Sequence, residues 1–321
     1  MFGTWDVDRD GGAWPARAGL FHHKGVSTTP RARSVGGGKS TQRKATRLLV
    51  ISTGAGNITP EIETRLRLLF ADYLIIPFDP KHDFEKLITP RARVVIAGGD
   101  GSVEFVVRKL ADSKHPVGIL SLGTFNNFAL ALGLRADLDK EVEVIKKGKP
   151  RPITLGRVNG TGFLEACAIG LFGETIALGE AAKDLQYGDF AAELGNVLAA
   201  KSFKYELEGD LQGSGTAMSL VFTNTSSIGA RLPVSDTTPI NPYLEFSVHA
   251  GRTKTDIAVR ALASAVLGKH EEEGSGQVFR FRKVSVRTSP RVRIYADNVL
   301  VGRTPATISA EVSALKVILP S

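Results

Sequence analysis

The sequence is poor in the residues that form covalent or metal cross-links. Its 321 residues include one cysteine, Cys167, and six histidines, and no two histidines have the HxxxH spacing. A single cysteine excludes an intramolecular disulfide framework and a cysteine-based zinc site, and the histidine pattern disfavours histidine-rich metal hydrolases. No apolar run approaches the roughly 20 residues that a membrane-spanning helix needs. The chain is therefore expected to fold around an apolar core without cross-links.

Length and composition predict a folded protein with two domains. A chain of 321 residues exceeds the roughly 100–200 residues of a usual single domain. Its 42% hydrophobic residues suffice for a sizeable core. No apolar stretch lies near residue 1, which argues against a secretory signal and predicts a cytoplasmic location.

The net charge of +8 is concentrated at one end of the sequence. Residues 1–47 contain nine basic and three acidic residues, so the remaining chain is close to neutral. A nearly balanced body weakens the case for a groove that binds nucleic acid. Residues 1–46 lack apolar periodicity, which predicts a flexible basic tail. Within this tail, Gly36-Gly37-Gly38-Lys39-Ser40 resembles a phosphate-binding P-loop, but Arg33 stands where that motif needs glycine.

Residues 47–149 alternate short apolar runs with helical patterns. Strands are expected at 47–51, 73–76, 94–97 and 117–120, and helices after residues 59 and 103. This alternation predicts a parallel sheet with helices on both faces, a three-layer α/β/α domain. Loops of small residues at 52–57, 98–102 and 121–129 each follow a strand. The carboxyl ends of parallel strands meet at one edge of a sheet, so the three loops predict a single binding site.

The loop at 98–102 has the composition of a phosphate cradle. It contains three glycines, Gly98, Gly99 and Gly101. Glycine leaves backbone N–H groups open to a polyphosphate, and the helix that follows adds its positive end. Ser102 and Thr124 supply hydroxyl groups and Asn126 an amide, whereas Asp100 would repel phosphates unless Mg²⁺ or a network of donors intervenes. Taken alone, the loop is equally consistent with a tight turn between a strand and a helix.

Two motifs, taken together, resemble the diacylglycerol kinase catalytic domain family. They are Gly98-Gly99-Asp100-Gly101-Ser102-Val103-Glu104 and, further along the chain, Leu122-Gly123-Thr124-Phe125-Asn126-Asn127-Phe128-Ala129. The loop Ser52-Thr53-Gly54-Ala55-Gly56 stands where the family shows a related small-residue loop. The resemblance covers about residues 47–320. The family belongs with the NAD kinases in a wider superfamily.

This resemblance implies an ATP- and Mg²⁺-dependent kinase that transfers the γ-phosphoryl group to a hydroxyl of diacylglycerol or a related lipid. It implies nucleotide contacts by residues of the three loops: Ser52, Thr53, Gly54, Gly56, Gly98, Gly99, Asp100, Gly101, Ser102, Val103, Glu104, Gly123, Thr124 and Asn126. In the implied catalytic roles, Asp100 organises the phosphates and the metal, and Asp297 orients or deprotonates the lipid hydroxyl. The resemblance identifies no metal ligand.

Residues 150–321 change to a pattern of short strands, which predicts an antiparallel β-sandwich. The resemblance implies that this sandwich is the lipid-acceptor domain. Strands at 151–158 and 162–169 flank Asn159-Gly160, a strong hairpin signal. Helices are expected at 174–200 and 256–267, with Glu174 and Glu180 on the helix surface. By family resemblance, the last segment returns to the first domain. Five arginines on the C-terminal strands are interpreted as a solvated face, with an anionic lipid surface as the alternative: Arg280, Arg282, Arg287, Arg291 and Arg293.

Three positions depart from the family pattern. The family carries Asp-Gly-Glu at this point, and Asp297 keeps its aspartate. Val299 occupies the position of its glutamate, which the resemblance implies is the general base in bacterial relatives. Valine accepts no proton, and loss of a positioned base typically costs roughly 10²–10⁴-fold in rate. Asn241-Pro242 replaces an acidic segment, and Ser52 replaces an asparagine. The nucleotide half is thus expected to be better preserved than the acceptor half.

Three functions follow as hypotheses. The leading one is a cytoplasmic lipid kinase, peripheral to the membrane through transient contact with an anionic surface, and without a nucleic-acid partner. The second is a homologue that binds nucleotide and lipid with weak or no turnover. The third is an NAD kinase. Neither the acceptor lipid nor the oligomeric state follows from the sequence.

Overall fold

The computed structural model describes residues 44–54, 56–175, 201–229, 231–249 and 278–321, and the structural statements below concern these residues. The predicted tail up to residue 43 and the predicted helix 256–267 lie outside them. The predicted helix 174–200 lies outside them beyond residue 175, and so does Glu180.

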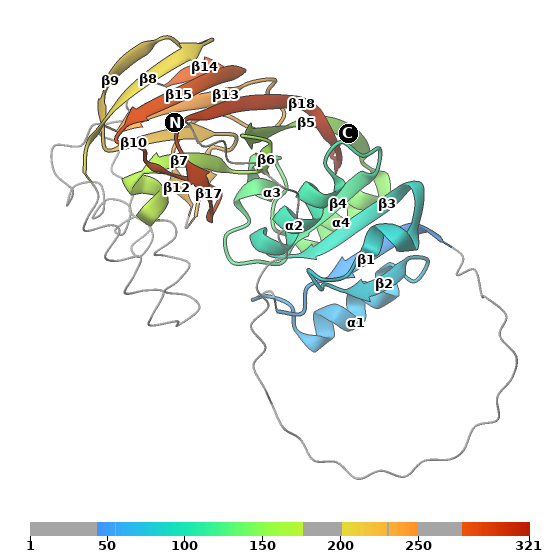
Figure 1. The fold of residues 1–321 in the computed structure, drawn as a ribbon. Helices are drawn as coiled ribbons and strands as arrows, with labels where there is room; N and C mark the ends of the chain where they lie inside the picture. The colour runs from blue at the N-terminus through green and yellow to red at the C-terminus, as the bar shows by residue number, and fades with distance from the viewer. Residues whose placement is uncertain (1–43, 55, 176–200, 230, 250–277) are drawn as a thin grey trace, which may run out of the picture. The chain divides into compact units, whose positions relative to one another are not determined.

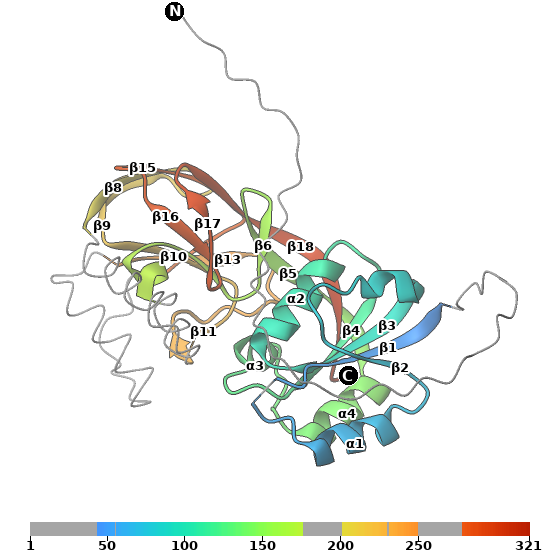
Figure 2. The same ribbon diagram turned by 60° about the horizontal axis from the view of Figure 1, so that its bottom comes forward.

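The first half of the chain forms the predicted parallel sheet, in the order β2-β1-β3-β4 (Figures 1 and 2). Its strands are β1 (Ala45–Ile51), β2 (Leu74–Pro77), β3 (Ile88–Gly98) and β4 (Pro116–Ser121). Its helices are α1 (Pro60–Leu69), α2 (Asp100–Leu110), α3 (Asn127–Ala131) and α4 (Leu138–Lys147), with a short 3₁₀ turn at Phe84–Leu87.

Alternate residues of the strands cover opposite faces of this sheet. Leu49 and Ile51 of β1 pack in the same buried cluster as Leu66 of α1, on the face that also holds α4. Leu48 of β1 packs in a second cluster with Val106 of α2. Burial on both faces explains why the strands are continuous apolar runs in the sequence. The sheet with helices on its two faces forms the three layers.

The helix starts follow the capping rules, with one shift. Thr59 accepts a hydrogen bond from the Ile62 amide at 3.3 Å, and Pro60 opens α1, as predicted. Helix α2 begins at Asp100, three residues before the predicted start at Val103. The Gly99 carbonyl accepts the amides of Ser102 and Val103, so the glycine loop is itself the first turn of the helix.

The same sheet continues through the C-terminal strand β18 (Ala306–Leu319), which runs parallel to β4. It then adds β15 (Lys283–Ser289), β8 (Phe203–Gly209) and β9 (Gly213–Ala217), and β18 also pairs with β5 (Lys149–Val158). Helix α4 reaches Lys147 and β5 begins at Lys149, so no linker separates the two halves there. The boundary between the predicted domains at 149 and 150 stays a prediction.

The Asn159-Gly160 hairpin is confirmed, but the strand after it is divided. Asn159 and Gly160 both have positive φ (48° and 88°), as a tight two-residue turn between β5 and β6 (Thr161–Phe163) requires. The chain then breaks at Leu164 and Glu165 and re-enters as β7 (Ala166–Gly170) in another sheet. The predicted single strand 162–169 is therefore wrong, and the break falls at the functional site.

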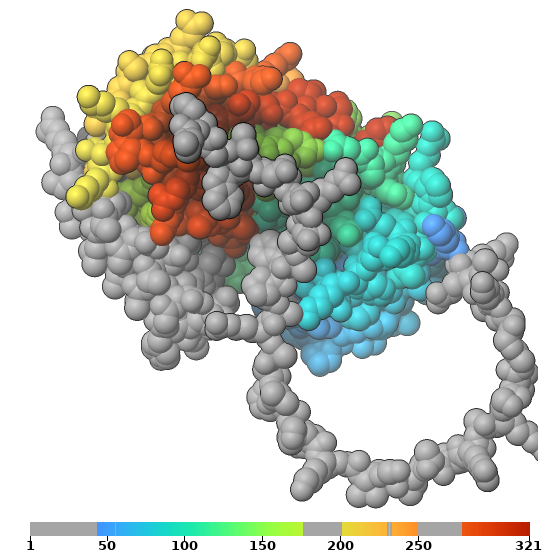
Figure 3. Space-filling view, in the orientation of Figure 1, coloured from blue at the N-terminus to red at the C-terminus, as the bar shows by residue number. Residues whose placement is uncertain are grey.

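The second sheet is antiparallel, in the order β14-β13-β10-β7-β16-β17. Its other strands are β10 (Ser219–Thr223), β13 (Leu244–His249), β14 (Phe279–Phe281), β16 (Arg293–Ala296) and β17 (Val299–Arg303), and a small separate ladder joins β11 (Ser227–Ile228) to β12 (Leu232–Pro233). Figure 3 shows the orange and red C-terminal strands next to the yellow β8 and β9.

The two sheets enclose an apolar core. Phe222 of β10 stacks on Phe246 at 4.8 Å between ring centroids and meets Phe281 edge-on at 5.6 Å. The same cluster includes Val284 and Ile308 of the first sheet. The predicted fold class, a three-layer α/β/α part plus an antiparallel sandwich, is confirmed. Within the described residues, no helix combines the length and hydropathy needed to cross a membrane.

Two surface predictions have different outcomes. Four of the five arginines on the C-terminal strands are exposed, and Arg293 is half-buried. Glu174, predicted on a helix surface, is buried, because its carboxylate accepts a 2.6 Å bond from Tyr295 Oη and lies 3.3 Å from Arg293 Nη1. That prediction was wrong, since both partners are distant in sequence.

We expect Phe222→Ala to lower the free energy of unfolding by about 3–5 kcal/mol, because it leaves a cavity beside the rings of Phe246 and Phe281. Leu68→Ala, at a side chain that is 75% exposed, should change it by less than about 0.5 kcal/mol. Urea unfolding monitored by circular dichroism measures both. Equal effects of the two substitutions would contradict a packed sandwich core.

Candidate active site

Three loops, each at the carboxyl end of a parallel strand, lie together in one hollow of about 690 Å³, the loop cleft. Of the residues predicted to bind or act, the following line it: Ser52, Gly54, Gly56, Gly99, Asp100, Gly101, Ser102, Glu104, Gly123, Thr124 and Asp297. The size is that of a small-molecule site. The three loops therefore converge as expected, and their role in binding stays a prediction.

Hydrogen bonds tie the loops to one another. Ser102 Oγ donates to Ser52 Oγ at 2.8 Å, which joins the first loop to the second. The backbone amide of Asn126 donates to Asp100 Oδ2 at 2.8 Å, which joins the second loop to the third loop. Asn57 Nδ2 donates to the Gly123 carbonyl at 2.9 Å and closes the set. The Asp100 carboxylate thus has a backbone donor from the third loop, within the protein itself.

The glycines of the cleft serve two different purposes. A Cβ on Gly123 would clash with the Gly99 backbone and lie 2.8 Å from Asn126 Oδ1, so two backbones meet there without room for a side chain. A Cβ on Gly54 or Gly101 would meet nothing within 4 Å. Glycine at 99 and 123 thus permits the loops to pack, whereas glycine at 54 and 101 keeps the floor of the cleft open to a ligand.

Four of the predicted binding residues do not line the cleft: Thr53, Gly98, Val103 and Asn126. Val103 belongs to the core between α2 and the sheet. Asn126 is 4% exposed; its Oδ1 accepts the Gly123 amide and its Nδ2 donates to the Gly123 carbonyl, both at 2.9 Å. The Asn126 side chain therefore shapes the third loop, and its predicted contact with nucleotide stays a prediction.

Asp297 joins the second sheet to helix α2. Its Oδ1 accepts the amides of Glu165 (2.8 Å) and Ala166 (3.1 Å), and its Oδ2 accepts the amide of Leu164 (3.0 Å) and Arg108 Nη2 (2.8 Å). Four donors use the lone pairs of both oxygens. The carboxylate thus holds open the break between β6 and β7 and connects it to α2. Neither Val299 nor Asn241-Pro242 lines the cleft.

The sequence analysis missed seven residues of the cleft. They are Phe125, Asn127, Glu165, Ala166, Ile228, Gly229 and Asn298. Glu165 had a detectable signal, because it is the one charged residue in the apolar run from Phe163 to Ile169. The segment around Gly229 had none, since it reaches the cleft only through tertiary folding.

Glu165 is in an unusual electrostatic environment. Burial raises the pKa of its carboxyl well above the ordinary value, and the negative charges of Asp100 and Asp297 raise it further. A hydrogen bond from the Gly229 amide opposes this only in part. Carboxyls with such shifts concentrate at functional sites.

The described side chains do not form a site for Mg²⁺. Among them no group of three or more His, Cys, Asp or Glu residues is arranged to hold a metal ion. Asp297, which lies in the cleft, already accepts four hydrogen bonds. The residues present therefore do not fit a preformed metal site of the kind that carboxylates build.

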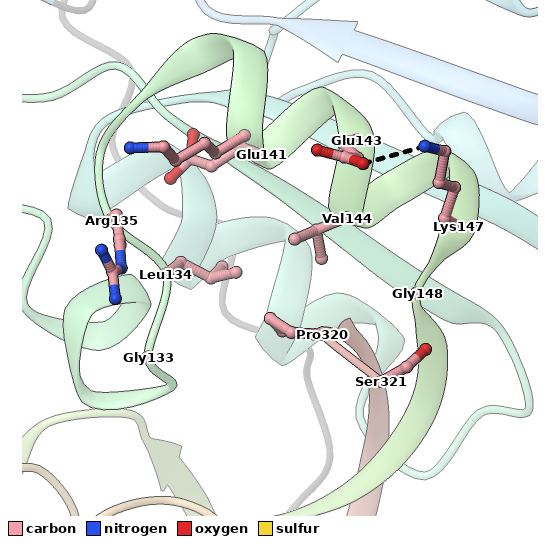
Figure 4. Close-up of a pocket in the computed structure, with 11 residues that line it drawn as sticks. Gly133, Leu134, Arg135, Glu141, Glu143, Val144, Lys147, Gly148, Pro320 and Ser321 are labelled. Carbon is pink, nitrogen blue, oxygen red and sulfur yellow. Dashed lines mark hydrogen bonds and ion pairs between the residues drawn. The ribbon is translucent and has the colours of Figure 1, made fainter.

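A second pocket, of about 470 Å³, lies along α4 beside the last residues of the chain (Figure 4). None of the residues predicted to bind or act lines it. Glu141, at its wall, accepts the Ser121 amide at 2.7 Å and Ser121 Oγ at 2.6 Å, and burial raises the pKa of this carboxyl. Glu141 thus supports the end of β4, from which the third loop starts.

Comparison with known proteins agrees with this geometry. Residues 42–158 match the family model of the diacylglycerol kinase catalytic domain. The resemblance seen in the motifs is confirmed. The chain is 25% identical over 234 residues to a diacylglycerol kinase of Bacillus subtilis (strain 168), covering 71% of this chain and 77% of that protein. Relatives named diacylglycerol kinase or lipid kinase support a kinase of the lipid kinase family.

Solved structures show the same fold. A putative diacylglycerol kinase from Bacillus anthracis str. Sterne aligns with a TM-score of 0.65 at 20% identity, covering 86% of this chain and 98% of that one. An NAD kinase from Archaeoglobus fulgidus in complex with ATP aligns with a TM-score of 0.52 at 15% identity, covering 86% and 93%. At these identities the likeness is one of fold.

We expect Gly123→Ala to destabilise the protein by about 1–3 kcal/mol, because its Cβ would displace the Gly99 backbone and the Asn126 side chain. Gly162→Ala is the matched control, since its Cβ would meet only the Gly156 carbonyl oxygen, at 3.9 Å. Thermal unfolding measures both. A melting temperature of Gly123→Ala equal to that of the control would show that the loops are not held together by this contact.

Proposed function

We propose that this protein is an ATP-dependent lipid kinase that transfers the γ-phosphoryl group of ATP to a hydroxyl of diacylglycerol or a related lipid. The observation that supports this most is the convergence of three glycine-containing loops with the first turn of α2 in one cleft. Backbone amides at a helix start favour a polyphosphate, and phosphoryl transfer depends mainly on positioning and charge compensation. The relatives named diacylglycerol kinase supply the acceptor class.

In this proposal the two halves of the cleft divide the work. Gly99, Gly101 and Thr124 would contact the phosphates from the parallel-sheet side. Ala166, Ile228 and Gly229 would face the acceptor from the sandwich side. Mg²⁺ would arrive with the nucleotide, whose phosphate oxygens and waters commonly supply most of its ligands. Exposed arginines of the C-terminal strands, among them Arg287, would meet the anionic surface from which the lipid comes.

We expect the purified full-length protein to transfer phosphate from γ-labelled ATP to at least one lipid in a panel of diacylglycerols and sphingoid bases presented in mixed micelles. Thin-layer chromatography detects the product, and NAD in place of lipid tests the NAD kinase alternative. ADP binding without transfer to any lipid would reduce the protein to the non-catalytic binder. Conversion of NAD to NADP as the only activity would replace the proposal.

The open floor of the cleft generates a separate prediction. Gly101→Ala should weaken ADP binding by about 10-fold or more, because a methyl group would stand where the phosphates approach the start of α2. The melting temperature should not fall, since nothing lies within 4 Å of the new Cβ. Isothermal titration calorimetry measures the affinity, with Gly162→Ala as control. Unchanged ADP affinity in Gly101→Ala would move the nucleotide away from this loop.

A further inference from the structure

Glu165 lies where the chain leaves one sheet for the other, and its side chain lines the loop cleft together with the glycine loops. Its position is fixed from the backbone, because its amide donates to Asp297 Oδ1 at 2.8 Å. No residue of the three loops supplies this carboxyl; it comes from the sandwich side of the cleft.

The two oxygens of Glu165 are in different situations. Oε2 accepts Asn127 Nδ2 at 3.2 Å and the Gly229 amide at 3.3 Å. Oε1 has no hydrogen-bond partner among the described residues. It is also not one of the polar atoms of these residues that are fully buried without a partner, which are Arg108 Nε and Asn224 Oδ1. One oxygen is therefore held by the protein while the other is left for a ligand in the cleft.

The charges around Glu165 favour its protonated form. Asp100 and Glu104 face it from α2, and Asp297 faces it from the turn between β16 and β17. The cation of this cluster, Arg108, is bound to Asp297 at 2.8 Å and to Glu104 at 2.9 Å. Within the described part of the chain, no Lys, Arg or His forms an ion pair with Glu165 itself. Burial and these carboxylates together raise its pKa well above the ordinary value.

We propose that Glu165 is the catalytic base of this site, taking the proton from the acceptor hydroxyl through Oε1. The proposal rests on the proposed lipid kinase function and assigns the proton-transfer role within it. As the hydroxyl oxygen forms its bond to the γ-phosphorus, the bond from that phosphorus to the β–γ bridging oxygen breaks. The proton passes to Glu165, and ADP leaves with the electron pair of the broken bond.

Two observations favour Glu165 over Asp297 for this step. Both oxygens of Asp297 are occupied by three backbone amides and Arg108, so it has no lone pair directed at a substrate. Glu165 has one such oxygen, and the burial that raises the pKa of its carboxyl makes the carboxylate a stronger proton acceptor. Asp297 is then a positioning residue, which holds the Glu165 backbone in place.

The test compares wild-type protein with Glu165→Gln and with Glu245→Gln, whose buried carboxyl pairs with Arg280 outside the cleft. In Glu165→Gln, kcat should fall by about 10²–10⁴-fold while ADP affinity stays within about threefold. The wild-type kcat/KM should rise with pH as Glu165 loses its proton, and this acidic limb should be absent from Glu165→Gln. A Glu165→Gln protein with near wild-type kcat and an unchanged pH profile would overturn the proposal.

A second variant tests whether the acidic limb of the pH profile reports the titration of Glu165. Asn127→Asp places a fourth carboxylate beside Glu165 in place of a hydrogen-bond donor, so it should shift the limb to higher pH, by about one unit or more. Glu245→Gln should leave the limb in place. A limb that does not move in Asn127→Asp belongs to another group and contradicts the assignment.

A third measurement does not depend on activity. Because the pKa of Glu165 is higher in the folded than in the unfolded chain, folding takes up a proton, and this residue costs more stability as pH rises between the two values. Glu165→Gln should match wild type near pH 4.5 and melt about 2 °C or more above it at pH 8. If the difference in melting temperature between Glu165→Gln and wild type does not grow with pH, the raised pKa of Glu165 is refuted. Failure of the wild-type protein to phosphorylate any acceptor would refute the proposed kinase function. This outcome is distinct from the results of the variants, which test only the role of Glu165.

Discussion

The contact between the backbones of Gly99 and Gly123 is the constraint on which the site depends. Parallel strands bring their carboxyl ends to one edge, but the edge alone does not make a cleft. Here two loops touch with no side chain between them, and the bond from the Asn126 amide to Asp100 fixes their spacing. Because those backbone and side-chain groups satisfy one another, the Gly54 and Gly101 surfaces are left open for a ligand.

Charge is the second organising feature of the cleft. The loops are proposed to receive a polyphosphate, yet four carboxyl side chains line the same cleft: Asp100, Glu104, Glu165 and Asp297. The structure reduces this repulsion in two ways: Arg108 bridges Glu104 and Asp297, and the environment of Glu165 raises the pKa of its carboxyl. A cation that entered the cleft with a ligand would lower the pKa of Glu165, because a positive charge near a carboxyl favours its ionised form.

The sequence predicted the parts of the fold that have local signals. Apolar runs located the strands of the parallel sheet, Thr59-Pro60 located the start of α1, and Asn159-Gly160 located a hairpin. The convergence of the three loops followed from parallel topology alone. The resemblance of two motifs then pointed to the diacylglycerol kinase catalytic domain, whose family model matches residues 42–158.

What the sequence did not predict is set by long-range contacts. Glu174 was placed on a surface because its partners Tyr295 and Arg293 are more than a hundred residues away. The strand expected at 162–169 divides because Asp297 draws the amides of residues 164–166 out of the ladder. Periodicity over a few residues contains no information about such a partner, so Glu165 read as a strand residue.

The break at Glu165 also explains how a site assembled from two sheets keeps its geometry. Strand β18 runs parallel to β4 and antiparallel to β5, so the sandwich side is built onto the same sheet that carries the loops. Asp297 adds a cross-link from the second sheet to α2, the helix that starts in the cleft. A movement that separated the two sides would break the ion pair between Arg108 and the buried Asp297 carboxylate, and breaking a buried pair is costly. The carboxyl proposed as base and the loops proposed to hold phosphate are therefore positioned by one shared anchor.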